Sequence, residues 1–351
     1  MDAKRILLID KDNKKQNDRT WCFWSKEKET FDPILYKSWS NILYADAGFE
    51  KTFDINPYKY KMIRGIDFYN HVIPFLKSKE NTDFTFEAIE SITESKDIVS
   101  VKTDTKEYNA PHLFKSYYEN LDFSNDLFVW QHFKGWLIKT ETDCFDPDQA
   151  HFMDFRTDQK NETRFFYVLP HSKREALIEI AIFSGEIPDS KFYDPLIKDY
   201  IKNILKIEDY KILEEEVNAI PMTGYDFSKN EQKRIINIGT NAGSVKASSG
   251  FAFKRIQEET DRIVEHIKKD KLSSYRFKKT RFSFYDKIML NAILTGKTNG
   301  ETVFGQLFRK LSPQTIFKFL DEKGSFFHDL KVFTAPPTLP FTKAFFEEIR
   351  K

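Results

Sequence analysis

One carboxylate of this sequence stands inside a strongly apolar segment, residues 176–183, which reads ALIEIAIF. In a β-strand alternate residues point to opposite faces, and both faces of this segment are apolar apart from Glu179. A carboxyl group among such neighbours is either paired with a base or protonated at neutral pH. A protonated carboxylic acid in an apolar site can donate its proton, so Glu179 is a candidate general acid. The alternatives are an edge-strand glutamate that faces water and a core glutamate in a salt bridge.

A second set of charged residues follows a spacing of two. Asp154, Arg156 and Asp158 would share one face of a strand over residues 151–159, where Arg156 could pair with both acids. Such a row is either a surface charge ladder, which contributes little to stability, or the polar wall of a cofactor or substrate site.

A glycine-containing turn lies between an apolar run at residues 234–238 and a segment of helical periodicity at residues 249–267. Backbone amides at a helix N-terminus favour anions and polarised oxygens, so such a turn is typical of phosphate or flavin contacts. Strand–glycine–helix junctions that bind nothing are also common. The residues of this turn that we interpret as cofactor ligands are Gly239, Thr240, Asn241 and Gly243.

The first apolar run of the chain, residues 4–10, ends in Asp10. A short buried strand that ends in an acid is typical of nucleotide-binding folds, where the carboxylate binds the ribose hydroxyls. Residues 11–25 are polar and then abruptly aromatic, and we expect a loop there. The residues of this loop that we single out, Arg19, Trp21 and Trp24, are either its anchors or a flap over a flavin.

The elements that must position these residues follow from the wider pattern. Residues 82–105 predict the strands of a meander, and residues 128–183 predict neighbouring strands of an antiparallel sheet. We therefore predict a mixed α/β fold with a Rossmann-like, nucleotide-type layer into which an antiparallel sheet is inserted. The predicted parts are cofactor-binding at 1–80 and 215–270, substrate-binding at 81–214, and mostly helical at 271–351.

Composition argues against several classes of function. The 55 basic and 54 acidic residues give a net charge of +1, which provides no electrostatic footprint for nucleic acid. The two cysteines lie far apart and the seven histidines lack ligand spacing, so we expect neither a disulfide framework nor a metal site. No apolar run is long enough for a signal peptide or a spanning helix, so we expect a cytoplasmic protein. The 35 phenylalanines fit either a Phe-rich core or a cavity for a large apolar ligand.

Seven short segments together, in this order along most of the chain, resemble the bacterial lycopene β-cyclase family of FAD-dependent carotenoid cyclases. They are NDRTWCFW (17–24), YKMIRG (60–65), MDFR (153–156), FYVLP (166–170), ALIE (176–179), IPMT (220–223) and SSGFAFK (248–254).

The resemblance implies a flavoprotein fold related to FAD-dependent hydroxylases and geranylgeranyl reductases. It implies acid-initiated closure of the ends of lycopene, or another linear carotenoid, into β-ionone rings without net redox change. Reduced FAD is the implied cofactor, and the family's functional carboxylate falls on Glu179. Because lycopene resides in lipid, we also expect peripheral docking at the inner face of the membrane, with Phe326, Phe327 and residues 341–346 as candidate contacts.

Two departures from the family pattern are visible. Ile180 and Ala181 stand where the family typically has polar residues, which would alter the hydrogen bonding and acidity of Glu179. Family members also begin with a strand and a Gly-rich turn, roughly 30 residues ahead of the acid-ended strand, whereas the first glycine here is Gly48. We therefore expect a truncated gene model, a fragment or a damaged gene that lacks the pyrophosphate turn.

Two other functions remain open from the sequence. The chain could be a flavin-dependent reductase or monooxygenase of a prenyl lipid, or a non-catalytic carotenoid-binding protein that has lost flavin binding. Product mass separates the enzymes, because cyclisation leaves the mass unchanged whereas reduction and hydroxylation shift it.

Overall fold

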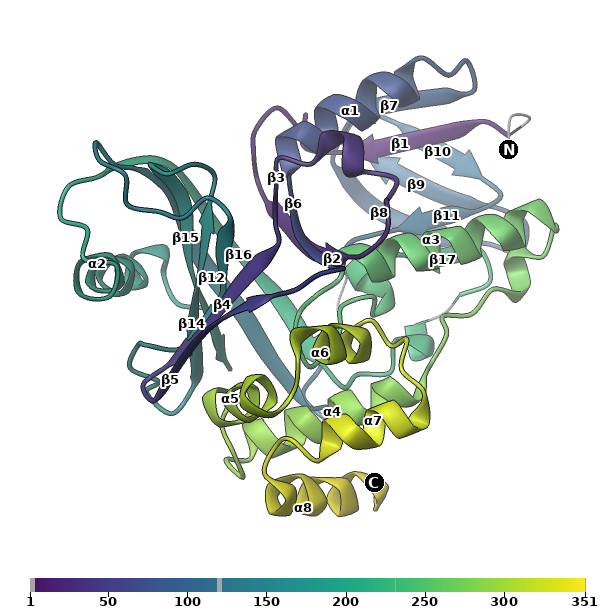
Figure 1. Cartoon of the computed structure of the whole chain (residues 1–351). Coiled ribbons are helices and arrows are strands. Elements are labelled where there is room, and N and C mark those ends of the chain that lie inside the picture. Colours follow the sequence, from purple (N-terminus) through teal and green to yellow (C-terminus); the bar gives the residue numbers. More distant parts are fainter. Residues whose placement is uncertain (1–3, 119–121, 231, 351) are drawn as a thin grey trace.

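The computed structural model describes residues 4–118, 122–230 and 232–350, which form a mixed α/β fold (Figure 1). Its largest element is a seven-stranded sheet in the order β16-β12-β15-β14-β13-β4-β5. Neighbouring strands are antiparallel except β13 and β4, which run parallel. The strands are β4 (Asn41–Asp46), β5 (Phe49–Asp54), β12 (Phe128–Lys139), β13 (Gln149–Asp154), β14 (Thr163–Pro170), β15 (Glu175–Ser184) and β16 (Lys211–Thr223).

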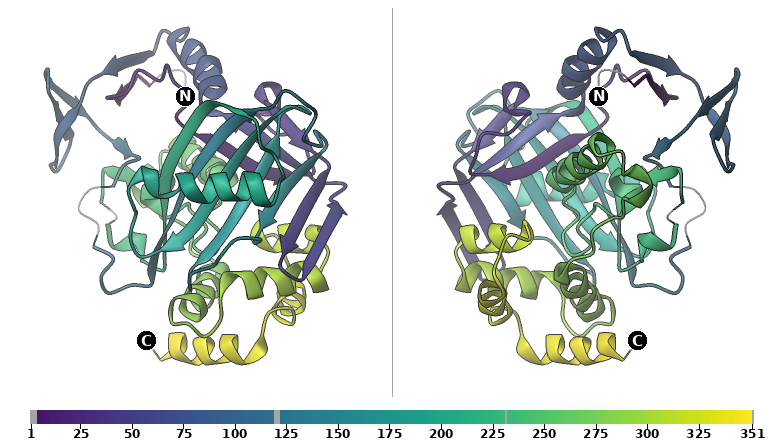
Figure 2. Two further views of the ribbon diagram at one scale, coloured as in Figure 1. Left: turned by 90° about the vertical axis from the view of Figure 1, so that its left-hand side faces the viewer. Right: turned by 90° about the vertical axis from the view of Figure 1, so that its right-hand side faces the viewer.

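The two faces of this sheet bury different partners. Helix α2 (Asp194–Asn203) crosses one face, where it packs on the even-numbered residues of β15, including Ile178 and Ile180 (Figure 2). The other face packs against β2 (Thr20–Ser25), β6 (Lys59–Arg64) and the helices α5 (Gly300–Lys310) and α6 (Pro313–Leu320). Strands β2, β6 and β3 (Lys37–Trp39) form a small sheet of their own, in the order β2-β6-β3. Glu179 alternates with Leu177 and Ala181, so it belongs to this second face, as the apolar pattern predicted.

The nucleotide-type layer consists of two separate parallel strand pairs. Strand β1 (Ile6–Asp10) pairs with β7 (Thr82–Phe86), and β11 (Leu113–Lys115) pairs with β17 (Ile235–Asn237). The meander β8 (Ile89–Glu94), β9 (Val99–Thr103) and β10 (Glu107–Ala110) contacts both pairs, since Ile9 and Leu113 pack against the valines of β9. Within the described residues β1 and β11 each have one strand neighbour, so each keeps one free edge.

Helices form most of the remainder. The α-helices are α1 (Gly65–Lys77), α3 (Phe253–Lys268), α4 (Arg281–Leu294), α7 (Phe326–Phe333) and α8 (Thr338–Ile349). The short 3-10 turns are η1 (Asp32–Ile34), η2 (Ser190–Phe192), η3 (Phe227–Asn230), η4 (Gly239–Ala242) and η5 (Leu272–Ser274). Thr280, Asn299, Ser312 and Ser325 each accept a backbone N–H with the side chain, which begins helices α4 to α7 at these positions. None of the helices in the described residues is long and apolar enough to cross a membrane.

Several local predictions were wrong. The second half of the expected loop at residues 11–25 is strand β2, because its aromatic residues pair with β6 and pack into the core. Strand β7 joins β1 instead of the meander. Helix α3 begins at Phe253 rather than near Ser249. Gly250 adopts a left-handed φ of 75°, which a right-handed helix cannot include, so the helix starts only after it.

Candidate active site

Glu179 is partly exposed within a stretch of β15 whose other residues are buried. Between Ala176 and Phe183, all of which are described, it is the single residue of β15 that is not fully buried. Its neighbour across the sheet on β12 is Gly135, which has no side chain to cover it. A Cβ at Gly135 would lie 3.4 Å from the Glu179 Oε2 and 2.9 Å from the Leu177 Cδ1. The glycine therefore leaves the space into which the Glu179 carboxyl group extends.

The surroundings of this carboxyl group favour its protonated form. Burial, and then the charge of nearby Glu216, hold the pKa of Glu179 well above its usual range. Tyr167 is its neighbour on β14, and the Cys22 thiol and Tyr60 hydroxyl approach it from β2 and β6. Burial raises the pKa of all three of these groups, so none carries a charge at neutral pH that could pair with Glu179. Of the alternatives drawn from the sequence, neither a water-facing edge residue nor a salt-bridged residue matches these contacts.

Aromatic rings gather beside the acid. The Tyr167 ring lies 5.2 Å from that of Phe165 and 6.3 Å from that of Phe152, between ring centroids. Tyr60 packs edge-on against Phe152 at 5.2 Å. Such rings present negative π-faces and no strong nucleophile, which suits a positively charged intermediate.

A second carboxylate that the sequence did not indicate lies in the same row. Glu216 on β16 is the other neighbour of Gly135, so Glu179, Gly135 and Glu216 follow one another across β15, β12 and β16. Glu216 is buried and accepts two hydrogen bonds from Thr20, from the backbone N at 3.0 Å and from Oγ1 at 2.7 Å. Sequence alone could not find this pair, because it depends on the register of three strands that are distant along the chain.

Asp154 and Arg156 form a bidentate ion pair, but Asp158 does not join it. The guanidinium donates to Asp154 at 2.9 and 2.6 Å, and the Tyr200 hydroxyl donates to the same carboxylate at 2.7 Å. Burial would raise the pKa of Asp154, but the neighbouring His151, Arg156 and Tyr200 side chains hold it well below its usual range. Strand β13 ends at Asp154, so Asp158 lies beyond it and pairs with Lys160 on the surface. The geometry supports a structural anchor at the strand end.

Asp10 occupies the carboxyl end of β1, as a ribose ligand requires. Its Oδ1 accepts the backbone N–H of Asp12 at 2.9 Å, and its Oδ2 pairs with Lys14 at 3.1 Å. The side chain is 38 % exposed, so one side of the carboxylate is accessible to a ligand.

The turn after β17 has an unusual backbone conformation. Gly239 and Gly243 have positive φ values of 63° and 80°, and the turn η4 lies between them. Asn241 is turned inward, where its amide donates to Asn237 and to the Lys115 carbonyl. The Asn241 side chain therefore shapes the turn, while Gly239 and Thr240 are half-buried.

The segment that leads from this turn to α3 carries buried polar atoms without a partner in the described residues. They are the hydroxyls of Ser244 and Ser249, and the amide oxygen of Gln131 on the adjacent strand β12 is likewise buried without a described partner. A Cβ at Gly250 would lie 1.8 Å from that Gln131 oxygen, so only glycine lets the chain pass here. Gln131 and Gly135 lie on the same face of β12, four residues apart, which corresponds to about 13 Å along the strand.

The aromatic residues of β2 do not form a flap. Trp24 is 3 % exposed and stacks on Phe317 with 4.7 Å between ring centroids. Trp21 packs between Phe68 and Phe253, and Arg19 pairs with Asp18 at 2.7 Å. Strand β2 instead lies beside the two carboxylates, with Thr20 close to Glu216 and Cys22 close to Glu179.

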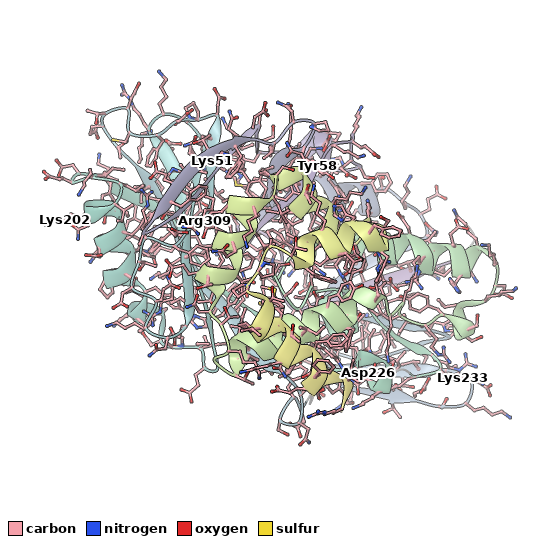
Figure 3. All side chains as sticks on the ribbon, turned by 60° about the horizontal axis from the view of Figure 1, so that its bottom comes forward. Lys51, Tyr58, Lys202, Asp226, Lys233 and Arg309 are labelled. Atoms are coloured by element: carbon pink, nitrogen blue, oxygen red, sulfur yellow. The ribbon has the colours of Figure 1, made fainter. Side chains whose placement is uncertain are left out.

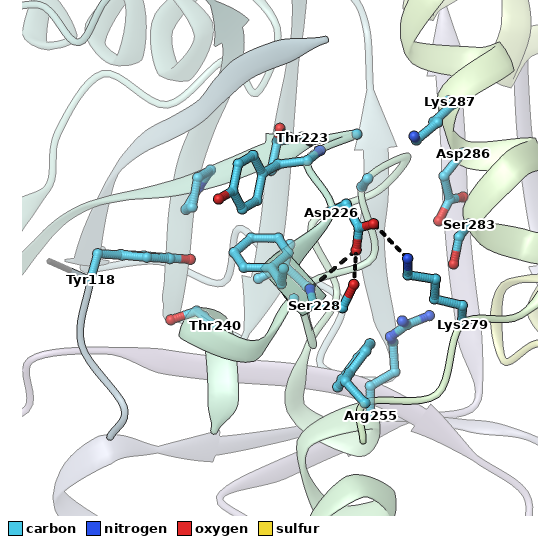
Figure 4. Close-up of a pocket in the computed structure, with 18 residues that line it drawn as sticks. Tyr118, Thr223, Asp226, Ser228, Thr240, Arg255, Lys279, Ser283, Asp286 and Lys287 are labelled. Carbon is cyan, nitrogen blue, oxygen red and sulfur yellow. Dashed lines mark hydrogen bonds and ion pairs between the residues drawn. The ribbon is translucent and has the colours of Figure 1, made fainter. Parts of the chain in front are cut away.

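A cavity of about 140 Å³ adjoins the other side of the turn, between η4 and α4 (Figure 4). Thr240 and Gly243 form part of its wall, and Lys279 faces Asp226 across it at 2.6 Å. Glu179 does not line this cavity.

Comparisons with solved structures place the fold among flavoenzymes. A geranylgeranyl bacteriochlorophyll reductase-like protein from Thermoplasma acidophilum superimposes with a TM-score of 0.60 at 11% identity, covering 97% of this chain and 92% of that chain. The flavin-dependent brominase Bmp2 gives 0.56 at 12% identity, covering 99% and 94%. The p-nitrophenol 4-monooxygenase PnpA from Pseudomonas putida gives 0.54 at 12% identity, covering 98% and 92%. Identities this low establish the shared fold and nothing of the reaction.

Comparison with protein families is more specific. No curated protein shows significant sequence similarity to the chain. The family model described as lycopene cyclase protein, however, matches residues 2–345, which is nearly the whole sequence. The chain therefore belongs to the lycopene cyclase family.

Proposed function

We propose that this protein is a lycopene β-cyclase in which Glu179 is the acid that starts ring closure. The observation that carries the proposal is the partly accessible carboxyl group over Gly135, set among aromatic side chains where burial favours its protonated form. Membership of the lycopene cyclase family supports a linear carotenoid as the substrate.

The reaction needs a strong acid away from water. Glu179 would donate its proton to a terminal C=C bond of the polyene, which leaves a carbocation. A neighbouring double bond of the substrate then attacks this centre and closes the ring, and loss of a proton from the new ring restores neutrality. One proton enters and one leaves, so the product is an isomer of the substrate. The rings of Tyr60, Phe152 and Tyr167 would stabilise the cation and exclude water.

The residues present also fit a flavin. The Ser244 and Ser249 hydroxyls can donate to carbonyl oxygens of a flavin ring, and the Gln131 oxygen can accept from its N–H. The backbone of Gly239 and Thr240 and the carboxylate of Asp10 suit the rest of FAD. In its reduced form a flavin would supply an electron-rich ring that steadies nearby positive charge.

We expect Asp10→Ala to weaken FAD binding by roughly tenfold to a hundredfold, because a hydrogen bond to a charged group contributes about 1.5–3 kcal/mol. Titration of FAD fluorescence against the purified protein measures this. Asp12→Ala is the matched control, since Asp12 is exposed and only accepts the nearby Lys14 N–H. Equal affinities for the two variants would remove Asp10 from the cofactor site.

An apolar surface at the C-terminal end supports docking on a membrane. Helices α7 and α8 lie at the bottom of Figure 1 and face the viewer in Figure 3. Phe327 is 82% exposed and Leu339 75% exposed, and Lys331 and Lys343 on the same two helices are also exposed. Other exposed apolar side chains on these helices are Phe326, Leu330, Phe333, Phe345, Phe346 and Ile349. A patch of this kind, with basic residues beside it, suits an anionic lipid surface.

Phe327→Ser should lower binding to phosphatidylglycerol-containing vesicles by roughly tenfold or more, since burying a phenylalanine contributes about 1.5–3 kcal/mol. Vesicle co-sedimentation gives the bound fraction. Phe75→Ser is the matched control, because Phe75 is also exposed but lies on α1 at the opposite end of the molecule (Figure 1). If both variants bind like the unaltered protein, the surface on α7 and α8 is not the docking site.

The proposed function is tested by pigment analysis of a lycopene-accumulating bacterium that expresses this chain or its Glu179→Gln variant. The proposal expects β-carotene or γ-carotene with the unaltered chain and unchanged lycopene with the variant. A product that has gained hydrogen or oxygen would favour a reductase or monooxygenase. Bound but unconverted lycopene would favour a carotenoid-binding protein.

A further inference from the structure

Glu179 and Glu216 flank the same glycine, and as cross-strand partners of Gly135 they lie on the same face of the sheet. They lie on β15 and β16, each beside Gly135 of the strand between them, so their Cα atoms are about 10 Å apart, twice the spacing of neighbouring strands. The Glu179 Oε2 already lies 3.4 Å from the position of a Cβ at Gly135. With any other residue at Gly135, a side chain would separate the two acids.

The two acids differ in how they are held. Burial raises the pKa of both carboxyl groups, but Glu216 accepts hydrogen bonds from the Thr20 backbone and hydroxyl that oppose this rise. No hydrogen bond to Glu179 is formed within the described residues, and apart from Glu216 the groups around it are apolar or uncharged at neutral pH. Two like charges at one desolvated site cannot both be stable, so the better-held acid ionises and the other keeps its proton.

We propose that Glu216 is a positioning residue that acts through Glu179: held by Thr20 and paired with Gly135 beside Glu179, it carries the single negative charge of the pair and so keeps the proton on Glu179. This inference deepens the proposed function, on which it rests for the role of Glu179 as the acid. It gives Thr20, the first residue of β2, the role of holding the Glu216 carboxylate through its hydrogen bonds.

None of the other titratable groups described around Glu179 supplies a negative charge in place of Glu216. The Cys22 thiol, the Tyr60 and Tyr167 hydroxyls and the His171 ring are neutral at neutral pH, with the pKa of His171 lowered by burial to about 4. On the Thr20 side, Arg19 and Asp18 pair with each other. Arg64 pairs with Asp67, and exposed Glu214 accepts from the Asn17 amide.

The test reads the proton on Glu179 directly. Infrared spectroscopy of the full-length protein follows the C=O band of protonated carboxyl groups during a pH titration, and the part lost in Glu179→Gln belongs to Glu179. Glu216→Gln removes the charge but keeps an oxygen that accepts the Thr20 backbone N–H, while its NH2 group can donate to the Thr20 hydroxyl oxygen. Because loss of that charge lowers the pKa of Glu179, its band should disappear at least about one pH unit lower. Glu214→Gln, on the same face of β16, is the matched control and should leave the titration unchanged.

Two further measurements test the same inference. Thr20→Val should move the Glu179 band in the same direction by less, since the backbone hydrogen bond remains. In an active preparation, the alkaline limit of cyclisation should move to lower pH in Glu216→Gln. An unshifted Glu179 band in Glu216→Gln, or no protonated Glu179 at neutral pH in the unaltered protein, would overturn the inference. The infrared result does not need turnover, so a shifted band without cyclisation would refute the proposed function alone.

Discussion

Glu179→Gln should lower the rate of carotenoid cyclisation by about a thousandfold, within the range that general acids contribute. Glutamine has the shape of glutamate and fits the gap at Gly135, but its amide cannot protonate a C=C bond. The variant should therefore fold and bind FAD like the unaltered protein and lose only turnover. Initial rates with reduced FAD and lycopene in liposomes measure the effect.

Glu175→Gln is the control for this substitution. Glu175 lies on the same strand, four residues from Glu179, and pairs on the surface with Lys139 at 2.8 Å. Exposed ion pairs contribute little, so the rate should be unchanged. Comparable turnover by Glu179→Gln and Glu175→Gln would exclude Glu179 as the acid.

Asp154→Ala should lower the free energy of unfolding by about 3–5 kcal/mol, because it leaves a partly buried cation without its bidentate partner. Arg156 and the Tyr200 hydroxyl both lose their bonds to the carboxylate. Urea denaturation followed by circular dichroism measures the change. Asp158→Ala removes an exposed pair with Lys160 and should cost less than about 1 kcal/mol. Similar losses in both variants would show that the charge ladder acts as one surface feature.

The same ion pair predicts a dependence of stability on pH. The pKa of Asp154 is lower in the folded protein than in the unfolded chain. Its contribution is therefore complete above the unfolded value, about 4, and is lost as the pH falls below it. In Asp154→Ala the decline of stability below about pH 4 should be correspondingly shallower.

Sequence reasoning reached the acid and the fold class through local patterns. Glu179 was visible because the residues around it alternate in a strongly apolar strand, and the structure confirms the two faces that this alternation predicted. The mixed α/β fold followed from strand and helix periodicities of the same kind. The division into cofactor, substrate and helical parts stays a prediction, and β4 and β5 from residues 41–54 lie in the large sheet.

The residues that sequence reasoning missed depend on contacts between distant segments. Gly135 and Glu216 matter only because β12 pairs with both β15 and β16 in one register, and no local pattern specifies that register. Trp24 was interpreted as part of a loop because the preceding residues are polar, whereas pairing with β6 decides its conformation. The run Glu214 to Glu216 resembles a solvated charge cluster, although its last member is buried.

The central claim, proton transfer from Glu179 to a carotenoid, is tested most directly by running the reaction in deuterated water and analysing the product by mass spectrometry. Because Glu179 exchanges its proton with solvent, the account predicts a cyclic isomer of lycopene with one solvent deuterium for each ring formed, and no such product from Glu179→Gln. An isomer without deuterium, or a product that has gained two hydrogens or an oxygen, would contradict it.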